Sequence, residues 1–208
     1  MRLLNVIRKE KERTVKFIIK EHSNNDDRIL NVGSSSTTFG QNSINLDIQK
    51  YPGIDLVADA HELPFVSESF NICVLSAVLQ YCRNPFQVAK EVCRVLMPGG
   101  FAVVDAPFVQ HYCLGTPDLY RFSKDGLKAV FDDHLEIVRC DVSISGGSAL
   151  AFYLQGISNV LTSNKYIRFI LTNLVSIMVY PLSFLKFKNK HEIAGAFILL
   201  GRKRSDME

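Results

Sequence analysis

The residues best suited to chemistry near the amino terminus lie between two short apolar runs, 29–32 and 44–46. Gly33 lets the chain turn sharply after the first run, and Ser34 and the two serines after it supply small hydroxyl donors. Asp47 directly follows the second run, where its carboxylate can accept two hydrogen bonds from a ribose diol. Because ligands of parallel sheets bind at the carboxyl ends of the strands, this combination indicates a nucleoside ligand.

Cysteine usage and charge exclude several other classes. The five cysteines are odd in number and show no CxxC spacing, so we expect free thiols, a reducing cytoplasmic compartment and no metal site. Residues 22–149 carry nine basic and fifteen acidic side chains, whereas both ends of the chain are basic. An acidic body is unlike a nucleic-acid binder, so we expect no nucleic acid among the partners.

The elements that must position these residues follow from apolar periodicity. Short apolar runs alternate with helical patterns, which predicts an α/β protein with a mostly parallel sheet of about six to seven strands. Asn84 and Pro85 are suited to begin one helix, and Ser123 to cap another that reaches about Phe131. Met97 to Gly100 is expected to end the first of these helices. The predicted strands are 29–32, 44–46, 54–58, 70–75, 101–104, 135–140 and 194–200.

The block from ADAHELPF to RVLMPGGFAVV resembles class I S-adenosylmethionine-dependent methyltransferases of the type-11 kind. In that family an acidic residue follows the third strand, then come LPF, a Phe-led fourth strand, a helix ending in RVLxPGG, and a fifth strand. The resemblance covers about residues 28–140 and implies a Rossmann-like fold with S-adenosyl-L-methionine as cofactor. PFVQHYCLGTPDLYRFSKDGL is similar to a subgroup associated with surface-polysaccharide genes.

The resemblance implies a cofactor site that begins where the first strand ends. Gly33 and Ser34 would approach the methionine part, and Asp47 the ribose hydroxyls. Ile48 would pack on the adenine, Asp59 would accept from its amine, and the Ala60 backbone would meet the ring. The Ser76 carbonyl would receive the cofactor amino group. The expected cofactor-binding residues are Asn31, Gly33, Ser34, Asp47, Ile48, Asp59, Ala60 and Ser76.

Several positions depart from the family pattern. Asn31 stands where a carboxylate is usual, Ser35 and Thr37 replace glycines, and Gln80–Tyr81 replaces a Glu-His pair. Only residues 33–42 separate the first two strands, so the first crossover helices must be short or absent. A catalytically degenerate cofactor-binding scaffold is therefore an alternative. A dehydrogenase is disfavoured because GxGxxG is missing.

The loop after the fifth strand holds the candidates for acceptor chemistry. His111, with an unperturbed pKa of about 6.5, and Asp118 are candidate bases for a hydroxyl acceptor. Tyr120 and Arg121 are expected to bind the substrate, although Arg121 can instead pair with Asp118 as a structural cluster. Asp105 is either a pocket acid or the end of its strand, and we assign no role to His61 or His134. The predicted reaction is O-methylation of a sugar or other small polar acceptor.

The carboxyl-terminal sixty residues contain an uncharged segment, 169–185, bordered by lysines and an arginine. Seventeen residues are short of the ~20 needed to span a bilayer. The segment can instead contact an anionic membrane together with the basic amphipathic helix at 1–21, or cover sheet surface left bare by the short crossovers. We favour the second interpretation. The predicted division is an amino-terminal helix, a methyltransferase core, an apolar helical insertion, and a closing strand with its tail: 1–21, 22–147, 148–190 and 191–208.

Overall fold

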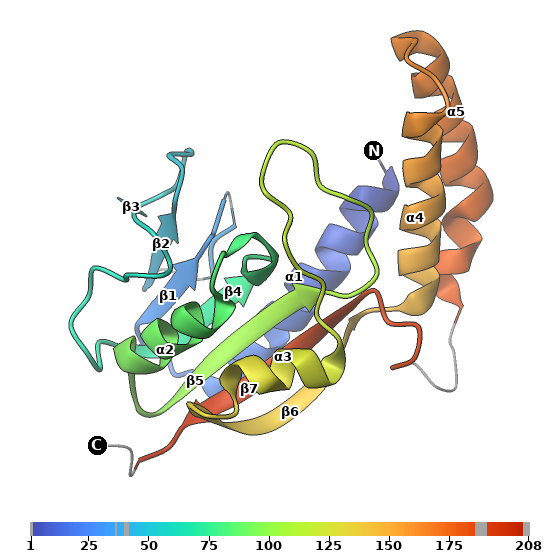
Figure 1. Ribbon diagram of the computed structural model, residues 1–208. Coiled ribbons are helices and arrows are strands. Elements are labelled where there is room, and N and C mark those ends of the chain that lie inside the picture. Colours follow the sequence, from blue (N-terminus) through green and yellow to red (C-terminus); the bar gives the residue numbers. More distant parts are fainter. Residues whose placement is uncertain (1, 36, 40–41, 186–190, 206–208) are drawn as a thin grey trace.

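The computed structural model describes residues 2–35, 37–39, 42–185 and 191–205 (Figure 1). Within them, seven strands form one sheet in the order β3-β2-β1-β4-β5-β7-β6. The first five strands are parallel, and β7 runs antiparallel to both β5 and β6. This confirms the predicted α/β, Rossmann-like class. The strands are β1 Ile29–Val32, β2 Ser43–Asp47, β3 Leu56–Val57, β4 Phe70–Ser76, β5 Leu96–Pro107, β6 Leu135–Ile144 and β7 Ala196–Lys203.

Two strands differ from their predicted bounds. β3 has two residues rather than the five expected at 54–58. β5 begins at Leu96, so the Met-Pro-Gly-Gly segment expected to act as a stop lies inside the strand. Its pairing with β4 starts at Phe70 and shifts register before Ile72, and Gly99 has a φ of 76°. The irregular pairing explains why a segment with turn-forming residues still joins the sheet.

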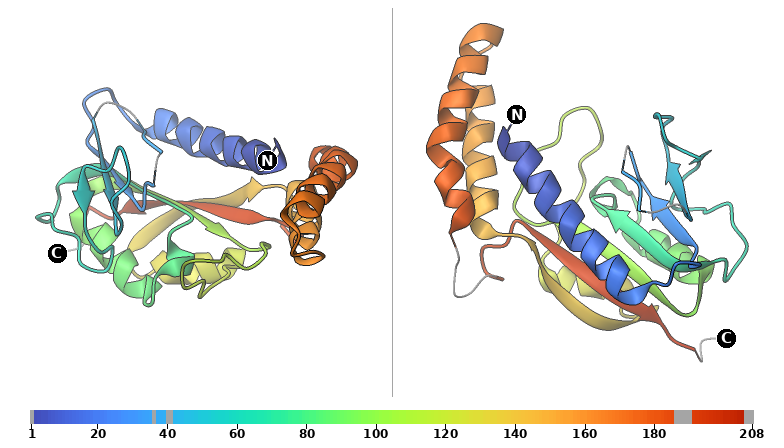
Figure 2. Two further views of the ribbon diagram at one scale, coloured as in Figure 1. Left: turned by 90° about the horizontal axis from the view of Figure 1, so that it is seen from above. Right: turned by 180° about the vertical axis from the view of Figure 1, so that it is seen from behind.

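The two faces of the sheet are covered by different helices (Figure 2). Helices α2, Pro85–Val95, and α3, Lys124–Phe131, lie on one face, and α1, Arg2–His22, lies on the other. The predicted caps are confirmed: the Asn84 side chain accepts from the backbone N–H of Gln87, and the Ser123 hydroxyl accepts from that of Gly126. A 3-10 turn, η1 Leu79–Tyr81, precedes α2.

Helix α1 takes the place of the missing crossover helices. No helix occurs between β1 and β2, or between β2 and β3, in the described part of the chain. The bare face is packed instead by Val15, Ile18 and Ile19 of α1, which are buried against strand residues such as Ile72 and Val103. Since strand side chains alternate between faces, the intervening residues face α2 and α3.

The prediction that residues 169–185 cover the sheet is wrong. Helices α4, Gly146–Val160, and α5, Lys165–Val179, form a hairpin that projects beyond the sheet, followed by a 3-10 turn, η2 Tyr180–Phe184 (Figures 1 and 2). Helix α5 packs on α4 and η2. The apolar face of α1 already occupies the sheet surface, so the insertion has none left to cover. None of the described helices is long and apolar enough to cross a membrane.

Candidate functional site

The turn after β1 requires glycine. Gly33 has a φ of 65°, and a Cβ atom there would lie 2.4 Å from Cγ2 of Val78. The chain then folds back, because the backbone N–H of Thr37 donates to the Ser34 carbonyl at 2.8 Å. A short loop rather than a helix therefore stands at the carboxyl end of β1.

Asn31 holds this loop over the strand. Its buried side-chain amide donates to the Thr37 carbonyl at 2.7 Å and to Asn45 Oδ1 at 3.1 Å. An ionised carboxylate has no proton to donate, so the family's usual acid at this position could make neither bond. The departure from the family pattern is thus explained by the way the loop folds back.

Asp47 lies at the carboxyl end of β2, as predicted. Its buried carboxylate accepts from the backbone N–H of Ser35 at 3.0 Å and of Gln49 at 3.1 Å. These bonds fix its direction and link β2 to the serine loop. Ile48, beside it, exposes 65% of its surface and leaves an apolar side chain open to a ligand.

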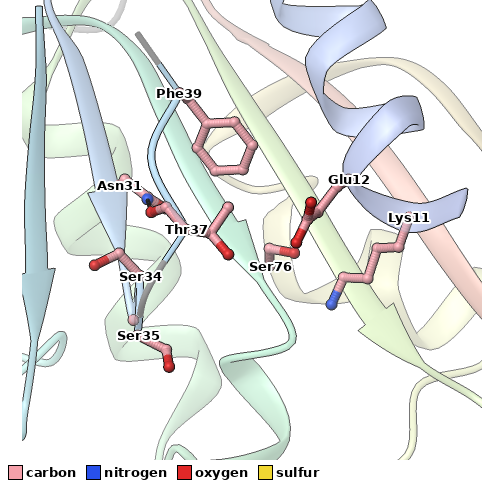
Figure 3. Close-up of a pocket in the computed structure, with 9 residues that line it drawn as sticks. Lys11, Glu12, Asn31, Ser34, Ser35, Thr37, Phe39 and Ser76 are labelled. Carbon is pink, nitrogen blue, oxygen red and sulfur yellow. Dashed lines mark hydrogen bonds between the residues drawn. The ribbon is translucent and has the colours of Figure 1, made fainter. Parts of the chain in front are cut away.

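A pocket of about 260 Å³ opens between this loop, the end of β4 and α1 (Figure 3). It brings together four predicted cofactor residues, Asn31, Gly33, Ser34 and Ser76. The other four, Asp47, Ile48, Asp59 and Ala60, are not in its lining. Ligand pockets commonly measure about 300–1,000 Å³, so the volume suits one part of a nucleoside cofactor. Its lining consists of Lys11, Glu12, Asn31, Gly33, Ser34, Ser35, Thr37, Phe39 and Ser76.

Helix α1 supplies two pocket residues that the sequence analysis missed, Lys11 and Glu12. The Lys11 ammonium lies 3.0 Å from Oδ1 of Asp105, which is buried and is the register partner of Ser76. Asp105 is therefore an ion-paired acid next to the pocket rather than a mere strand end. Lys11 and Asp105 are 94 residues apart, so no local sequence pattern predicts their contact. The sequence showed only that residues 1–21 form an amphipathic helix with a polar face.

Two buried oxygen atoms in this region lack a partner among the described residues. They are Oγ of Ser34, in the pocket lining, and Oδ2 of Asp105. Buried polar atoms are normally hydrogen-bonded, so a polar ligand reaching either oxygen would satisfy it. Donors and acceptors of this kind fit the amino and carboxylate groups of a methionine moiety.

Asp59 is oriented by His61, to which no role was assigned. The Asp59 carboxylate accepts from the His61 backbone N–H at 2.9 Å and lies 2.6 Å from Nδ1 of its ring. These hydrogen bonds hold the pKa of Asp59 below its ordinary value. His61 Nε2 in turn accepts from the Asn84 backbone N–H, which places the ring proton on Nδ1. His61, to which the sequence analysis assigned no role, therefore orients the Asp59 side chain.

The loop after β5 gathers the predicted acceptor residues into one cluster. The two terminal guanidinium nitrogens of Arg121 donate to the Asp118 carboxylate, at 2.5 and 2.6 Å, and one of them also donates to the His111 carbonyl. The Cys113 backbone N–H donates to Asp118 as well. Arg121 keeps the pKa of Asp118 below its usual value, so Asp118 is suited to fixing the loop and is a poor base.

His111 has the properties of a neutral imidazole. Its ring packs on Phe152 of α4 at 4.4 Å between centroids, and burial lowers its pKa. Nδ1 is buried and has no hydrogen-bond partner among the described residues. The Tyr120 side chain binds a different segment of the chain, since its hydroxyl donates to the Arg83 carbonyl at 3.1 Å. Burial raises the pKa of Tyr81 to about 12, so its phenol stays protonated.

Comparison with known proteins identifies the fold's family. Residues 35–104 match the family described as "Methyltransferase domain". Over these residues the chain is similar to methyltransferase domains, and an uncharacterized methyltransferase of Mycobacterium marinum is 32% identical over 84 residues, which cover 35% of this chain and 33% of that protein. The predicted family and cofactor class are thereby confirmed, whereas the surface-polysaccharide subgroup and the residue roles stay predictions.

The methyltransferase domain is matched only in part by curated relatives. The demethylmenaquinone methyltransferase of Lysinibacillus sphaericus is 35% identical over 88 residues, which cover 40% of this chain and 37% of that protein. The chain spans between 8% and 37% of the length of four such relatives. Their matches therefore identify a domain and not the activity of a whole protein.

Solved structures are similar over nearly the whole chain. A SAM-dependent methyltransferase of Thermotoga maritima has a TM-score of 0.59 at 12% identity, covering 96% of this chain and 92% of that one. The [4+2]-cyclase SpnF has the same TM-score at 14% identity, covering 92% and 81%. At these identities the likeness establishes the fold alone.

Proposed function

We propose that this protein transfers the methyl group of S-adenosylmethionine to an oxygen of a sugar or other small polar acceptor. The observation that carries the proposal is the pocket where Asn31, Gly33, Ser34 and Ser76 meet at the carboxyl ends of β1 and β4. A Rossmann-like sheet binds its ligand at this edge. The buried, unpaired Ser34 hydroxyl supports a polar ligand there.

The cofactor would extend from this pocket along the end of β2. In the proposed arrangement Ser34 and Ser76 hold the methionine part, and the fixed carboxylate of Asp47 accepts from the ribose hydroxyls. Ile48 offers an exposed apolar surface to the adenine, while Asp59, oriented by His61, accepts from its amine. The backbone of Ala60 completes the adenine contact.

The bound cofactor supplies an already activated methyl group. The chain's own task is to align the acceptor oxygen, exclude water and remove one proton. Helix α1, whose Lys11 and Glu12 line the pocket, is proposed to help exclude water. We assign proton removal to neutral His111, and loop positioning to the Asp118–Arg121 pair. Tyr120 and Arg121 are proposed to line the acceptor side.

The alternative is a cofactor-binding scaffold without methyl transfer. It is favoured by the small pocket and by the pairing of Asp118 with Arg121. SpnF, a [4+2]-cyclase of similar fold, shows that this fold carries other chemistry.

We also propose that the protein works in the cytoplasm on a small-molecule or glycan acceptor, at the inner face of a membrane and without nucleic acid. All five cysteines are free thiols, which suits a reducing compartment. The acidic middle of the chain disfavours nucleic acid.

Calorimetric titration with S-adenosylhomocysteine tests the cofactor site. Asp47→Ala should weaken binding at least about tenfold, because a charged hydrogen-bond acceptor is lost. Asp125→Ala, at an exposed position on α3, is the matched control and should bind like the wild type. No binding by the wild type would overturn the proposal. Binding without turnover on a panel of sugars and nucleotide sugars would favour the scaffold.

A further inference from the structure

The α4–α5 hairpin exposes large apolar side chains, while its interior holds polar residues as well as apolar Ala151 and Val179. Gln155 of α4 and Ser176 of α5 are buried between the helices, where the Gln155 amide donates to the Ser176 hydroxyl at 2.6 Å. By contrast, Phe169, Ile177 and Met178 of α5 each expose about 70% of their surface or more. A helix in water normally does the reverse. The hairpin therefore has the residue distribution of an element whose outer surroundings are apolar.

The outer face of α5 is continuous. At 100° per residue the exposed side chains of Tyr166, Ile170, Leu174, Ile177 and Met178 cover one broad side of the helix, away from buried Ser176 and Val179. Helix α4 lies between this side and α1, so the outer face points away from the rest of the molecule (Figure 2). We define the outer face of α5 by Tyr166, Ile170, Leu174, Ile177 and Met178.

The segment that contains the α4–α5 hairpin, residues 142–191, carries only positive charges. Residues 142–191 contain five Lys or Arg and no Asp or Glu. Lys165 and Arg168 are exposed where the hairpin turns, and the Lys165 ammonium lies 5.1 Å from the centre of the Tyr166 ring. An apolar helix face with exposed basic residues and a tyrosine in the first turn of the same helix is suited to the boundary between anionic headgroups and acyl chains.

We propose that the outer face of α5 docks this protein onto an anionic lipid bilayer. With 15 residues α5 is about 22 Å long, shorter than the hydrocarbon core of about 30 Å, so it lies in the interface rather than crossing it. Its apolar side chains enter the acyl boundary, and Lys165 and Arg168 contact lipid phosphates. No bond is made or broken in this docking.

A second copy of the chain fits the same face less well. Two hairpins packed through their outer faces would offer the basic side chains of either hairpin no acidic partner, since residues 142–191 contain no Asp or Glu. A bilayer with anionic lipids offers those charges a counterpart. A second copy and a bilayer would both offer an apolar surface to α5. Only the anionic bilayer also offers negative charge to its basic residues.

Docking would tether the acceptor loop to the bilayer through the hairpin, with α4 between this loop and α5. The middle of α4 contacts the acceptor loop, because Phe152 packs on the His111 ring and Gly156 lies close to it. Ser148 of α4 also donates to the Glu10 carboxylate of α1 at 3.1 Å. If methyl transfer occurs as proposed, its acceptor is carried by a lipid; this clause rests on the proposed function, whereas the docking does not.

Vesicle co-sedimentation of the full chain tests the docking. We expect binding to phosphatidylcholine vesicles that contain about a third phosphatidylglycerol, and weaker binding to phosphatidylcholine alone. Leu174→Ser/Ile177→Ser should lower the partition coefficient at least about tenfold, since two apolar side chains no longer enter the bilayer. Lys165→Gln/Arg168→Gln should lower binding to the anionic vesicles and leave that to phosphatidylcholine unchanged.

Matched variants keep the test decisive. Val66→Ser changes an equally exposed apolar residue far from the hairpin, and Lys90→Gln an exposed lysine on α2; both should bind like the wild type. Unchanged circular dichroism would show that the α5 variants remain folded. Absence of vesicle binding, or binding insensitive to the α5 variants, would overturn the docking. So would a wild-type dimer in solution that Leu174→Ser/Ile177→Ser converts to monomer without any vesicle binding. Titration with S-adenosylhomocysteine is unaffected by either result, so the proposed function is judged separately.

Discussion

Helices α1 and α5 look alike in sequence and have opposite surroundings. Both are basic near one end and rich in large aliphatic residues. In α1 the apolar residues Val15 and Ile18 are buried on the sheet, whereas in α5 Ile177 and Met178 remain exposed. An apolar stripe thus shows that a helix requires an apolar neighbour. It does not show whether that neighbour is the protein's own sheet.

The largest expected difference between α1 and α5 is in how much a truncated apolar side chain lowers the free energy of unfolding. Ile18→Ala is expected to lower the free energy of unfolding by about 2–5 kcal/mol, because it leaves a cavity between α1 and the sheet. Ile177→Ala should change it by less than about 0.5 kcal/mol, since the side chain is already solvated. Urea unfolding measures both. Equal losses would show that α5 is packed in solution.

The polar side of α1 offers a second test. Lys11→Met leaves Asp105 buried without its cation and should lower the unfolding free energy by about 1–3 kcal/mol. Adding Asp105→Asn should recover part of that loss, because the uncompensated charge is removed. Lys16→Met, at an exposed position of the same helix, is the control. If Lys16→Met lowers the unfolding free energy as much as Lys11→Met does, the ion pair does not stabilise the fold.

Substitution of Gly33 tests whether the loop after β1 forms part of the cofactor pocket. Gly33→Ala combines a left-handed backbone with a clash against Val78, and should destabilise by about 1–3 kcal/mol while abolishing cofactor binding. Gly53→Ala has a similar φ of 88° but meets no atom within 4 Å, so only the backbone strain remains. Titration of both variants separates strain from loss of the pocket. Full binding by Gly33→Ala would show that the loop plays no part.

The smallest expected effect concerns pH. His111 has a lowered pKa, so its neutral form persists below the ordinary value of about 6.5. Its contribution to stability is present above that value and is lost as the pH falls through the lowered pKa. Methyl transfer should fall with it, with an acid midpoint below about 6.5 that disappears in His111→Phe. A midpoint above that value, or an unchanged profile in the variant, would exclude His111 as the base.

The sequence predicted those parts of the structure that rest on local patterns. β1, β2 and β4 follow from continuous apolar runs, and the caps Asn84 and Ser123 from residue type and position. The β5 start was missed because Met-Pro-Gly-Gly favours a turn, and only pairing with β4 overrides that preference.

The site was predictable only in part. Asn31, Gly33, Ser34 and Ser76 meet as expected because they end neighbouring strands. Lys11 was missed because it reaches Asp105 through packing of α1 on the sheet, a contact without local pattern. His61 was missed because its effect depends on the position of Asn84. Such contacts between distant segments are set by the fold and not by neighbouring residues.

A crystal structure with S-adenosylhomocysteine tests the central claim most directly. We expect the methionine part in the pocket beside Ser34 and Ser76, the ribose hydroxyls on the Asp47 carboxylate, and the adenine between Ile48 and Asp59. Density for the ligand at another edge of the sheet, or a serine loop that stays closed over the pocket at saturating ligand, would contradict the account.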